Sequence, residues 1–431
     1  MLMLYGLIID KLNHYNHISP NMELNMNMRI NVLPLIYTLT LLSLTACTMT
    51  QQPIGNSEEP YPPESPVVGE IYHLPTGIKV SQEQMLSTII DARIIYVGET
   101  HDNPAAHRVE LAVLTAMAER YPGQLSLGLE MFNTGQQDAL DQWIAGELSE
   151  KEFLKNSQWY NNWRMDYAYY RDILNYAREH QVPVIGLNAT RELVKQVGRT
   201  PFERLDEEVR EQLPEINMED PYQSAMAKAI FADHSSGNSM LDGFLRIQTL
   251  WDETMAENVA RIMREQSPEH HMVVMAGGNH VRYGFGIPRR VYRRLPTSYA
   301  LVGSRELVVP EDKQDTLMSV EMPLFPMPAY DYLVYTEYES LPGEPVKLGV
   351  HMQEEDGKVV VEKIVPGSTA DQSGVLAGDT IISLGGIRIK ENFDLIYEVQ
   401  QRFSGDQATL VVEREGELIN LDVTFSPLPK H

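Results

Sequence analysis

The sequence predicts an α/β fold, with a mainly parallel sheet flanked by helices and interrupted by a helical insertion, followed by a small β-rich domain. Between about residues 69 and 337, short apolar runs alternate with helix-like stretches, which is the pattern of a parallel sheet. Residues 135–159 read as extra helical material after the second run. Beyond residue 345 the composition shifts to short apolar runs between glycine-containing turns. A chain of 431 residues has room for two to three such domains.

The expected elements have recognisable ends. Asn103-Pro104 combines an N-cap residue with proline at the first helical position, so it opens a helix that runs through Glu119. Apolar residues from Leu241 to about Gln266 keep helical spacing. Residues 201–221 are acidic and irregular. The expected strands are Arg93–Val97, Leu125–Leu129, Pro183–Leu187, Met272–Ala276, Tyr299–Val302 and Tyr332–Thr336.

The first 46 residues read as a leader and signal peptide. Arg29 supplies a positive charge, and Val32–Leu44 is apolar but too short to span a bilayer. Leu44-Thr45-Ala46-Cys47 resembles a bacterial lipobox, which implies cleavage before Cys47 and attachment of lipid to it. Residues 1–27 match no targeting pattern, so Met28 is favoured as the true start. The alternative is an incidental cysteine after a short apolar helix.

Residues 47–68 form a disordered tether, because this stretch rich in proline, glutamine and glutamate has too little apolar surface to fold. Thr48, rather than an acidic residue, follows the cysteine, which by resemblance to Gram-negative lipoproteins implies the outer membrane. The body would then face the periplasm, where an ATP-driven function is not expected.

The net charge of −25 excludes partners that carry dense negative charge. Such an acidic body repels nucleic acid and anionic lipid headgroups, and no basic stripe opposes this. The chain would therefore meet the membrane through its lipid anchor only. With a single cysteine, no intramolecular disulfide can form.

Two motifs of the form G-x-x-H mark the candidate site. Gly98–His101 and Gly277–His280 each follow directly on an apolar run. Histidines placed in this way lie at the carboxyl end of a parallel sheet, where open α/β sheets carry their sites. The motifs therefore predict two imidazoles in one crevice.

Two further expected strands also end in polar residues, Glu130 and Asn188, and Glu99 precedes the first histidine. A carboxylate directly after a buried strand is costly unless it is paired, bound to metal or open to a cleft. The alternative is that these residues cap helices or satisfy loop backbones.

Two chemistries suit Glu99, His101, Glu130 and His280. They could bind a divalent metal ion that keeps a position open for water. They could instead form carboxylate–histidine pairs that act as acid and base without metal.

A second cluster is aromatic and hydroxylic. Flat aromatic walls and phenols suit haem, whose ferric iron accepts tyrosinate. The alternative is an aromatic helix face packed into the core, or, for the histidine at 234, a solvated loop. The haem-binding candidates are Tyr160, Tyr167, Tyr169, Tyr170, His107, His234 and Arg164.

Residues 69–337 resemble the ChaN-like lipoproteins, a group related to the TIKI proteases and erythromycin-esterase-like hydrolases. The resemblance implies haem or iron uptake, with haem held between two subunits through tyrosine. The TIKI branch implies instead a metal-dependent hydrolase that uses His101, His280 and Glu130, with Glu99 beside them. The motifs that carry the resemblance are Gly98–Pro104, Leu129–Phe132, Val184–Asn188, Trp251–Ala256 and Gly277–His280.

After a hinge at residues 338–345, residues 346–426 resemble a PDZ domain of the kind found beside bacterial proteases. The turn Leu348-Gly349-Val350 and the run from Val365 to Ala370 carry the resemblance, together with Gly374–Ile382. Backbone N–H groups at such a turn hold a C-terminal carboxylate, and the neighbouring strand pairs with the peptide. The alternative is a small β domain without peptide affinity. No G-x-S-x-G motif is present, which argues against a serine protease.

Three hypotheses follow. The favoured one is a binding protein: an outer-membrane haem-binding lipoprotein that faces the periplasm, serves haem or iron uptake and docks a partner through its PDZ-like domain. The second is a metal-dependent hydrolase, and the third is a non-catalytic envelope scaffold. The sequence leaves open the hydrolysed bond, the ligating tyrosine, the PDZ ligand and the oligomeric state, which a haem between subunits would make at least dimeric.

Overall fold

The computed structural model describes residues 65–163, 165–232, 238–311, 323, 325–343 and 346–427. The predicted leader, the lipidation site at Cys47 and nearly all of the tether lie outside these residues. Among the described residues, no helix is both long and apolar enough to cross a membrane.

The centre of the fold is an eight-stranded sheet in the order β2-β1-β8-β7-β3-β6-β4-β5. From β8 to β5 every neighbouring pair is parallel, and only β1 and β2 at one edge are antiparallel. This confirms the predicted, mainly parallel sheet. Each expected strand is present, whereas β1 and β2 were not expected because three residues are too few to form a visible apolar run. The strands are β1 Ile71–His73, β2 Ile78–Val80, β3 Ile94–Glu99, β4 Leu125–Asn133, β5 Val184–Asn188, β6 His271–Gly277, β7 Tyr299–Val308 and β8 Tyr332–Glu337.

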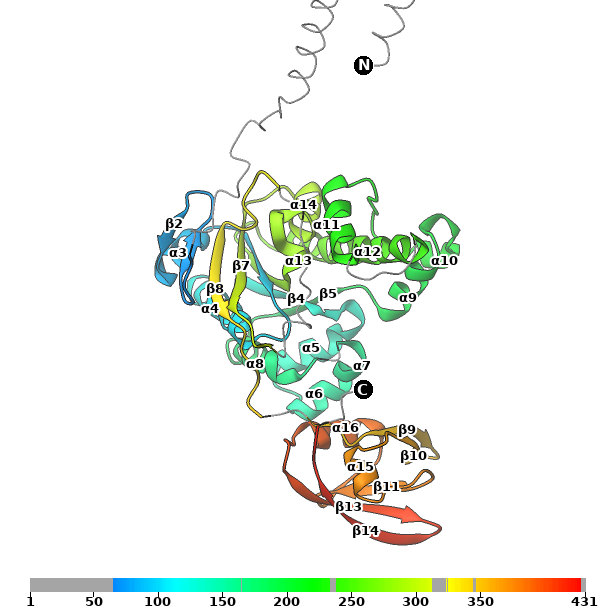
Figure 1. The fold of residues 1–431 in the computed structure, drawn as a ribbon. Coiled ribbons are helices and arrows are strands. Elements are labelled where there is room, and N and C mark those ends of the chain that lie inside the picture. The colour runs from blue at the N-terminus through cyan, green and yellow to red at the C-terminus, as the bar shows by residue number, and fades with distance from the viewer. Residues whose placement is uncertain are drawn as a thin grey trace, which may run out of the picture. The chain divides into compact units, whose positions relative to one another are not determined.

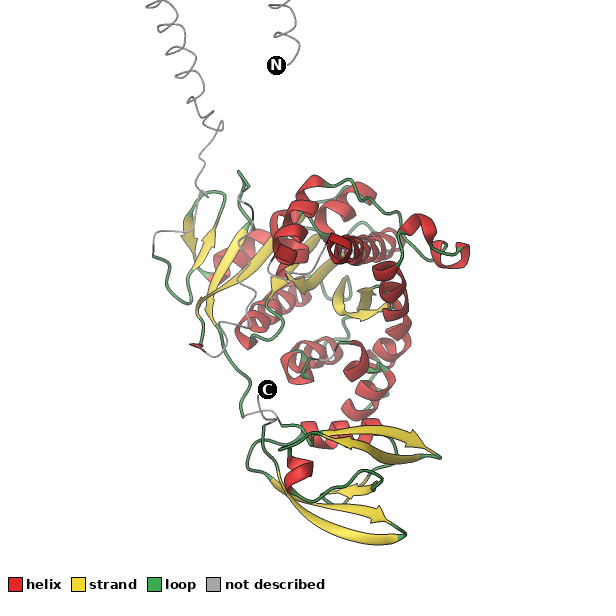
Figure 2. Ribbon diagram, turned by 45° about the vertical axis from the view of Figure 1, so that its right-hand side comes forward, coloured by secondary structure: helices red, strands yellow, loops and turns green. Residues whose placement is uncertain are grey.

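Both faces of the sheet are covered by helices, so its strands are buried on both sides (Figures 1 and 2). In β3, Ile95 and Val97 face one core cluster, while Ile94 and Tyr96 face the other. The first cluster packs against α3 Gln82–Ile89, α4 Pro104–Arg120, α5 Gln137–Ile144, α6 Glu150–Asn156 and α8 Arg171–Glu179. The second packs against α12 Asn238–Glu265 and α14 Ile287–Arg294.

A helical insertion follows β4, as the sequence predicts. It contains α5, α6 and α7 Trp159–Asn162, and its large aromatic side chains explain why it folds onto the sheet. Trp143, Phe153 and Trp159 are each at most 1% exposed. Ser149 begins α6 with a capping box, because its hydroxyl accepts from the Glu152 amide while the Glu152 carboxylate accepts from the Ser149 amide.

The remaining helices include two that follow strands of the sheet directly. Among them, α9 follows β5 and α13 follows β6, so both begin at the edge where the candidate site residues lie. The remaining elements of this domain are η2 Thr134–Gln136, η3 Tyr167–Tyr169, α9 Arg191–Arg199, η4 Phe202–Arg204, α10 Glu207–Arg210, α11 Pro221–Ala232, α13 Gly278–Val281 and η5 Arg282–Gly284.

The C-terminal domain is built on a separate antiparallel sheet in the order β14-β13-β11-β10-β9, with β12 paired to β11. Its core contains Val359, Val361, Leu410 and Val412, each at most 1% exposed. Strand β9 lies at the edge of this sheet. The elements are β9 Val350–Glu355, β10 Lys358–Ile364, α15 Thr369–Gln372, β11 Thr380–Leu384, β12 Ile387–Arg388, α16 Asn392–Gln400, β13 Gln407–Arg414 and β14 Glu417–Thr424.

Asn103 ties the start of α4 to the ends of two strands. Its side-chain oxygen accepts from the amides of Ala105, at 3.0 Å, and Glu339, at 3.1 Å. Its amide donates to the Glu306 carboxylate at 2.8 Å and to the Glu337 carbonyl at 3.1 Å. Asn103 is fully buried, so its loss would leave the buried Ala105 amide without a partner and break three further bonds to partly buried groups.

We therefore expect Asn103→Ala to lower the free energy of unfolding by about 2–4 kcal/mol, the sum of a lost cap and unsatisfied buried groups. Ser81→Ala removes an exposed cap from α3 and should cost about 1 kcal/mol. Urea denaturation of both variants measures the difference. Equal losses would show that the links from Asn103 to the strands contribute nothing beyond ordinary capping.

Candidate functional site

The two G-x-x-H motifs lie side by side, because β3 and β6 are neighbouring parallel strands with Glu99 opposite Gly277. Their glycines permit this approach. A Cβ at Gly98 would lie 3.2 Å from the Gly278 Cα, and one at Gly277 would lie 2.9 Å from His101 Nε2. The sequence pattern therefore describes two strand ends that are too close for side chains at these positions.

His101 is held by Glu99. Its Nδ1 lies 2.7 Å from Glu99 Oε1, so its Nε2 is left free and faces the space beside Gly277. The His101 side chain is 30% exposed, whereas that of Glu99 is fully buried. The edge of the imidazole packs against Trp163 with ring centroids 4.8 Å apart.

His280 is held in the same way, by Asp252 of α12. Its Nδ1 lies 2.6 Å from Asp252 Oδ1, and its Nε2 lies 3.4 Å from Glu130 Oε1. The second oxygen of Glu130 accepts from the Gly277 amide at 2.7 Å. Glu130 therefore lies between the two histidines, since its Oε2 is also 3.6 Å from the point where a Gly277 Cβ would stand. Each histidine has a carboxylate at Nδ1 that orients its ring, so both Nε2 atoms point toward the space around Glu130.

Behind His101 lies a buried cluster of Glu99, His107, Glu110 and Tyr170. His107 Nδ1 is 2.8 Å from Glu110 Oε2 and 3.0 Å from Glu99 Oε2, and its Nε2 donates to the His101 carbonyl at 3.0 Å. The Tyr170 hydroxyl donates to Glu99 Oε1 at 3.2 Å. Glu99 therefore connects this cluster to His101.

Burial and neighbouring charges shift the pKa values of the acidic and imidazole groups of the site. Burial alone would raise the pKa of Glu99, but His107 and His101 outweigh it and lower that pKa to about 2. Burial together with Glu99 raises the pKa of Glu110 to about 8. Burial would lower the pKa of His107, yet Glu99 and Glu110 raise it to about 11. For His280, Glu130 and Asp252 likewise overcome burial and raise the pKa to about 9.

Asp252 is fixed by a network that sequence reasoning did not identify. Its second oxygen accepts from the Gln223 amide, and the Gln223 carbonyl accepts from Arg290. Arg290, 1% exposed, also pairs with the fully buried Glu253 at 3.2 Å. Asp252 stands in the motif Trp251–Ala256, but nothing in its local pattern indicates which histidine it would contact.

A cavity of about 1210 Å³ opens beside Glu130. The end of β4, α7 with the turn after it, α9 and α12 supply its walls. Most of the lining is apolar or aromatic, with uncharged amides between. The apolar and aromatic lining residues are Met131, Phe132, Trp163, Ala189, Val194, Phe231, Met240, Phe244, Ile247 and Trp251.

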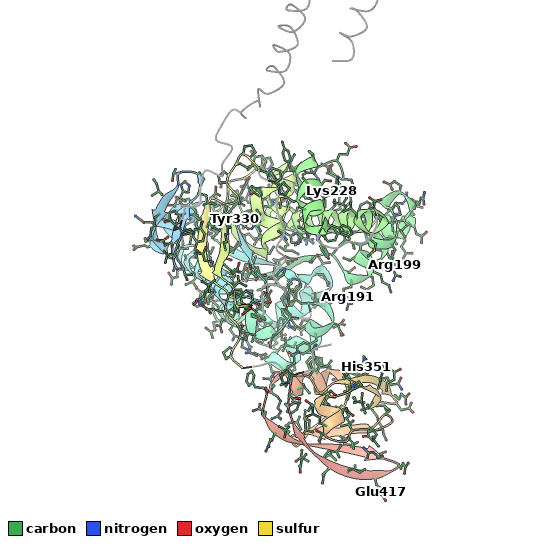
Figure 3. All side chains as sticks on the ribbon, in the orientation of Figure 1. Arg191, Arg199, Lys228, Tyr330, His351 and Glu417 are labelled. Carbon is green, nitrogen blue, oxygen red and sulfur yellow. The ribbon has the colours of Figure 1, made fainter. Side chains whose placement is uncertain are left out.

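Along α9 the cavity is lined by a row of cations, Arg191, Lys195 and Arg199 (Figure 3 labels the first and last). Their spacing of four residues places all three on one face of the helix. Glu130 and Glu192 are the acidic residues of the lining. The spacing of the cations is visible in the sequence and could have identified this row.

The structure brings Glu99, His101, Glu130 and His280 together at one edge of the sheet, as the motifs predict. Asn188 also lies there and donates to the Glu130 carbonyl at 3.1 Å. The tyrosines are placed differently. Tyr167 and Tyr170 are each 1% exposed within the core, Tyr160 and Tyr169 are half-buried, and none of the four lines the cavity. His107 is buried in the cluster behind His101, while Arg164 and His234 lie outside the described residues.

In the C-terminal domain, Leu348, Gly349 and Val350 lead into the edge strand β9. Leu348 is 3% exposed, and Gly349 has φ +82°, a conformation that glycine adopts without strain. The Gly349 carbonyl accepts from the Val365 amide at 2.9 Å. Because β9 has a neighbour on one side only, an extended peptide could pair with its free edge.

Three similarities to known proteins are limited in extent. The chain is 23% identical over 261 residues to Protein RETICULATA-RELATED 5, chloroplastic, of Arabidopsis thaliana, covering 56% of this chain and 34% of that protein. It is 28% identical over 125 residues to Type II secretion system protein C of Aeromonas hydrophila, covering 28% of this chain and 39% of that one. The chain thus spans well under half the length of these relatives. A solved structure of ChaN of Campylobacter jejuni, described as showing cofacial haem binding, matches with 17% identity and a TM-score of 0.48, covering 63% of this chain and 97% of that one.

Two family models match the chain. One describes ChaN, of haem-binding uptake and the Tiki superfamily, and covers residues 85–291. The other describes the PDZ domain and covers residues 346–425. The first range contains strands β3 to β6 of the eight-stranded sheet, and the second contains the whole antiparallel C-terminal sheet. The chain therefore carries a domain that matches the model of the ChaN haem-binding family of the Tiki superfamily, followed by a C-terminal PDZ domain.

Proposed function

We propose that the ChaN-like domain binds haem in the cavity beside Glu130, and that the PDZ domain docks the C-terminus of a partner protein. The observation that carries the haem proposal is the cavity's composition: a mostly apolar lining together with the cation row of α9. Its volume of about 1210 Å³ exceeds that of ordinary ligand pockets, which is about 300–1,000 Å³, so it suits a large ligand.

The residues present fit haem. The macrocycle is flat and apolar, and Trp163, Phe244 and Trp251 supply aromatic surface. The two propionates need cations, which the row on α9 supplies. The iron needs an axial ligand, and His101 is a partly exposed imidazole whose Nδ1 is engaged by Glu99 while Nε2 is free. A carboxylate on the far side of a ligating imidazole raises its basicity.

Haem ligation by a tyrosine stays a prediction. Burial raises the pKa of Tyr160 and Tyr167, and that of Tyr169 to about 12, so none of these phenols ionises readily by itself. Within the described chain, His101 is the better supported axial ligand, because its imidazole packs against Trp163 of the cavity lining although His101 itself is not part of that lining. A tyrosine supplied by a second copy, across a homodimer interface, remains compatible with this arrangement.

We place this binding protein in the cell envelope. The support is the sequence before the described residues: a positive charge, a short apolar stretch and the lipobox-like segment that ends at Cys47. A lipid anchor there would hold the body at the outer membrane, facing the periplasm. Haem captured at that location would serve haem or iron uptake.

The paired histidines favour a second candidate, a metal-dependent hydrolase. Glu99 and Asp252 fix the two imidazoles with both Nε2 atoms toward the space around Glu130, so His101, His280 and Glu130 would hold a divalent ion. Such an ion, when bound, polarises a carbonyl and activates water. The carboxylates behind the histidines would orient the imidazoles for that role, and the ion would displace the proton that Glu130 and Asp252 favour on His280.

The haem proposal predicts that haemin gives a Soret band with the protein, and that Lys195→Glu combined with Arg199→Glu weakens haemin affinity about tenfold or more, since about 1.4 kcal/mol of lost attraction has that effect. Titration followed at the Soret band measures both. Lys228→Glu changes the net charge in the same direction on the exposed surface of α11, outside the cavity, and should leave affinity nearly unchanged (Figure 3).

His101→Ala should shift the Soret band because it removes the axial imidazole. A spectrum that haemin leaves unchanged in the wild type would end the proposal. Equal effects of the α9 and Lys228 variants would show that only overall charge matters.

If the hydrolase candidate holds, the protein loaded with Zn²⁺ or Mn²⁺ cleaves members of a peptide and ester panel. Asp252→Asn should then lower turnover about 10- to 100-fold, because a lost partner behind a ligand has effects of that size. Asp242→Asn changes an exposed carboxylate of the same helix and serves as the control. If the metal-loaded protein cleaves no member of the panel faster than the metal-free protein does, hydrolysis of these substrates is excluded.

For the PDZ domain, we expect a peptide with a free C-terminal carboxylate to bind at least about tenfold more tightly than the same peptide with an amidated end, because a charge-assisted hydrogen bond is lost. Selection from a C-terminal peptide library supplies the ligand. Gly349→Ala should weaken binding, whereas Gly357→Ala imposes comparable strain at φ +72° in the turn at the other end of β9 and should not. Binders indifferent to amidation and to Gly349 would contradict the docking role.

A further inference from the structure

We propose that Glu99, His107 and Glu110 form a second site, which binds a divalent first-row transition metal ion behind His101. This site does not depend on the haem proposal or on the hydrolase candidate. It lies in the core between β3 and α4, and neither His107 nor Glu110 lines the cavity.

The spacing of the three residues suits coordination. His107 Nδ1 is 2.8 Å from Glu110 Oε2 and 3.0 Å from Glu99 Oε2, and one ligand atom from each residue lies within 4.8 Å of the others. Ligand atoms at about 2.1 Å from an ion are separated by about 3 Å or slightly more. The three atoms therefore need to move little to surround an ion.

The second nitrogen of His107 is already placed as in metal sites. Nε2 donates to the His101 carbonyl at 3.0 Å, and a carbonyl can only accept. This bond fixes the proton on Nε2, so Nδ1 can be the unprotonated ligand atom. Metal-bound histidines commonly donate their other N–H to a backbone carbonyl in this way.

The charge of the cluster also calls for a cation. Glu110 is fully buried, and Glu99 and His107 are each 5% exposed, so two carboxylates share one imidazole out of reach of bulk water. A divalent ion would take the place of the proton that the two buried carboxylates otherwise hold with His107, and it would balance their charge. Within the described part of the chain, Glu110 Oε1 has no hydrogen-bond partner, so an oxygen is available to complete the coordination.

The donor set selects the class of ion. Two carboxylates and one imidazole suit Mn²⁺, Fe²⁺ or Zn²⁺, whereas Ca²⁺ and Mg²⁺ prefer oxygen ligands alone. Glu99 would bridge this ion, through Oε2, to His101, through Oε1. The ion would thus hold the carboxylate that orients His101 without reaching the cavity. The competing occupant is a proton shared between His107 and Glu110.

The test uses the full-length chain, freed of metal with EDTA and then equilibrated with Mn²⁺. We expect about one ion per chain, and pulsed EPR should show a single coordinated imidazole nitrogen. Glu110→Gln keeps the shape of the side chain but removes its charge, and should weaken Mn²⁺ binding about 100-fold, at the upper end of effects on metal sites. His280→Gln alters the paired histidines around Glu130 instead and should leave Mn²⁺ binding to this cluster intact.

Three results would overturn the proposal. The wild type could fail to bind Mn²⁺, Fe²⁺ or Zn²⁺, in which case a proton occupies the cluster. Glu110→Gln could bind as the wild type does. Finally, His280→Gln could fail to bind the ion, or the spectrum could show two coordinated imidazoles. Either result would mean that the ion binds beside Glu130. If Glu110→Gln does not fold, the number of coordinated imidazoles in the wild-type spectrum decides which site holds the ion. Haemin titration tests the haem proposal separately.

Discussion

The parallel pairing of β3 with β6 is the constraint on which the rest of the site depends. It sets Glu99 opposite Gly277, and the absence of side chains at Gly98 and Gly277 lets the two strand ends approach. Any other neighbour for β3 would separate His101 from His280. This register also brings His101 beside Gly277, whose amide Glu130 contacts.

Several carboxylates in and around the site are buried away from water. Glu99, Glu110 and Glu253 are essentially buried. Glu99 lies against His101 and His107, Glu110 also lies against His107, and Glu253 is paired with arginines. Such groups seldom improve stability compared with apolar residues of the same size. For Glu99 the better explanation is its effect on His101, since it engages Nδ1 of that histidine as Asp252 engages Nδ1 of His280.

The cavity adds a property that the histidines lack. A cation row and an apolar lining select a large ligand with a flat apolar body and negative groups, whereas the paired imidazoles alone would suit a small ion and water. Haem satisfies both features of the cavity and can take an imidazole as its axial ligand. This agreement between lining and family is why a binding role is favoured over hydrolysis.

Much of this could be predicted from the sequence. The alternation of apolar runs with helically spaced apolar residues predicted the parallel sheet. This works because the spacing of the buried residues along a strand or helix is visible in that segment alone. The G-x-x-H motifs and Glu130 identified residues that meet at one edge of the sheet, because each follows directly on a buried strand. The N-cap at Asn103 was likewise visible from two adjacent residues. The antiparallel edge strands β1 and β2 were not, because three residues carry no period.

What only the tertiary structure decided are the partners. Asp252 meets His280 from a helix 28 positions away, and Glu130 meets the Gly277 amide across 147 positions. The tyrosines of 160–170 looked alike in the sequence, yet two of them lie in the core and none lines the cavity. The residue type and its local sequence indicate which chemistry a side chain can perform. The choice between cavity, core and ion pair depends on which strands become neighbours, and strand order is set by packing over the whole domain rather than by any single segment.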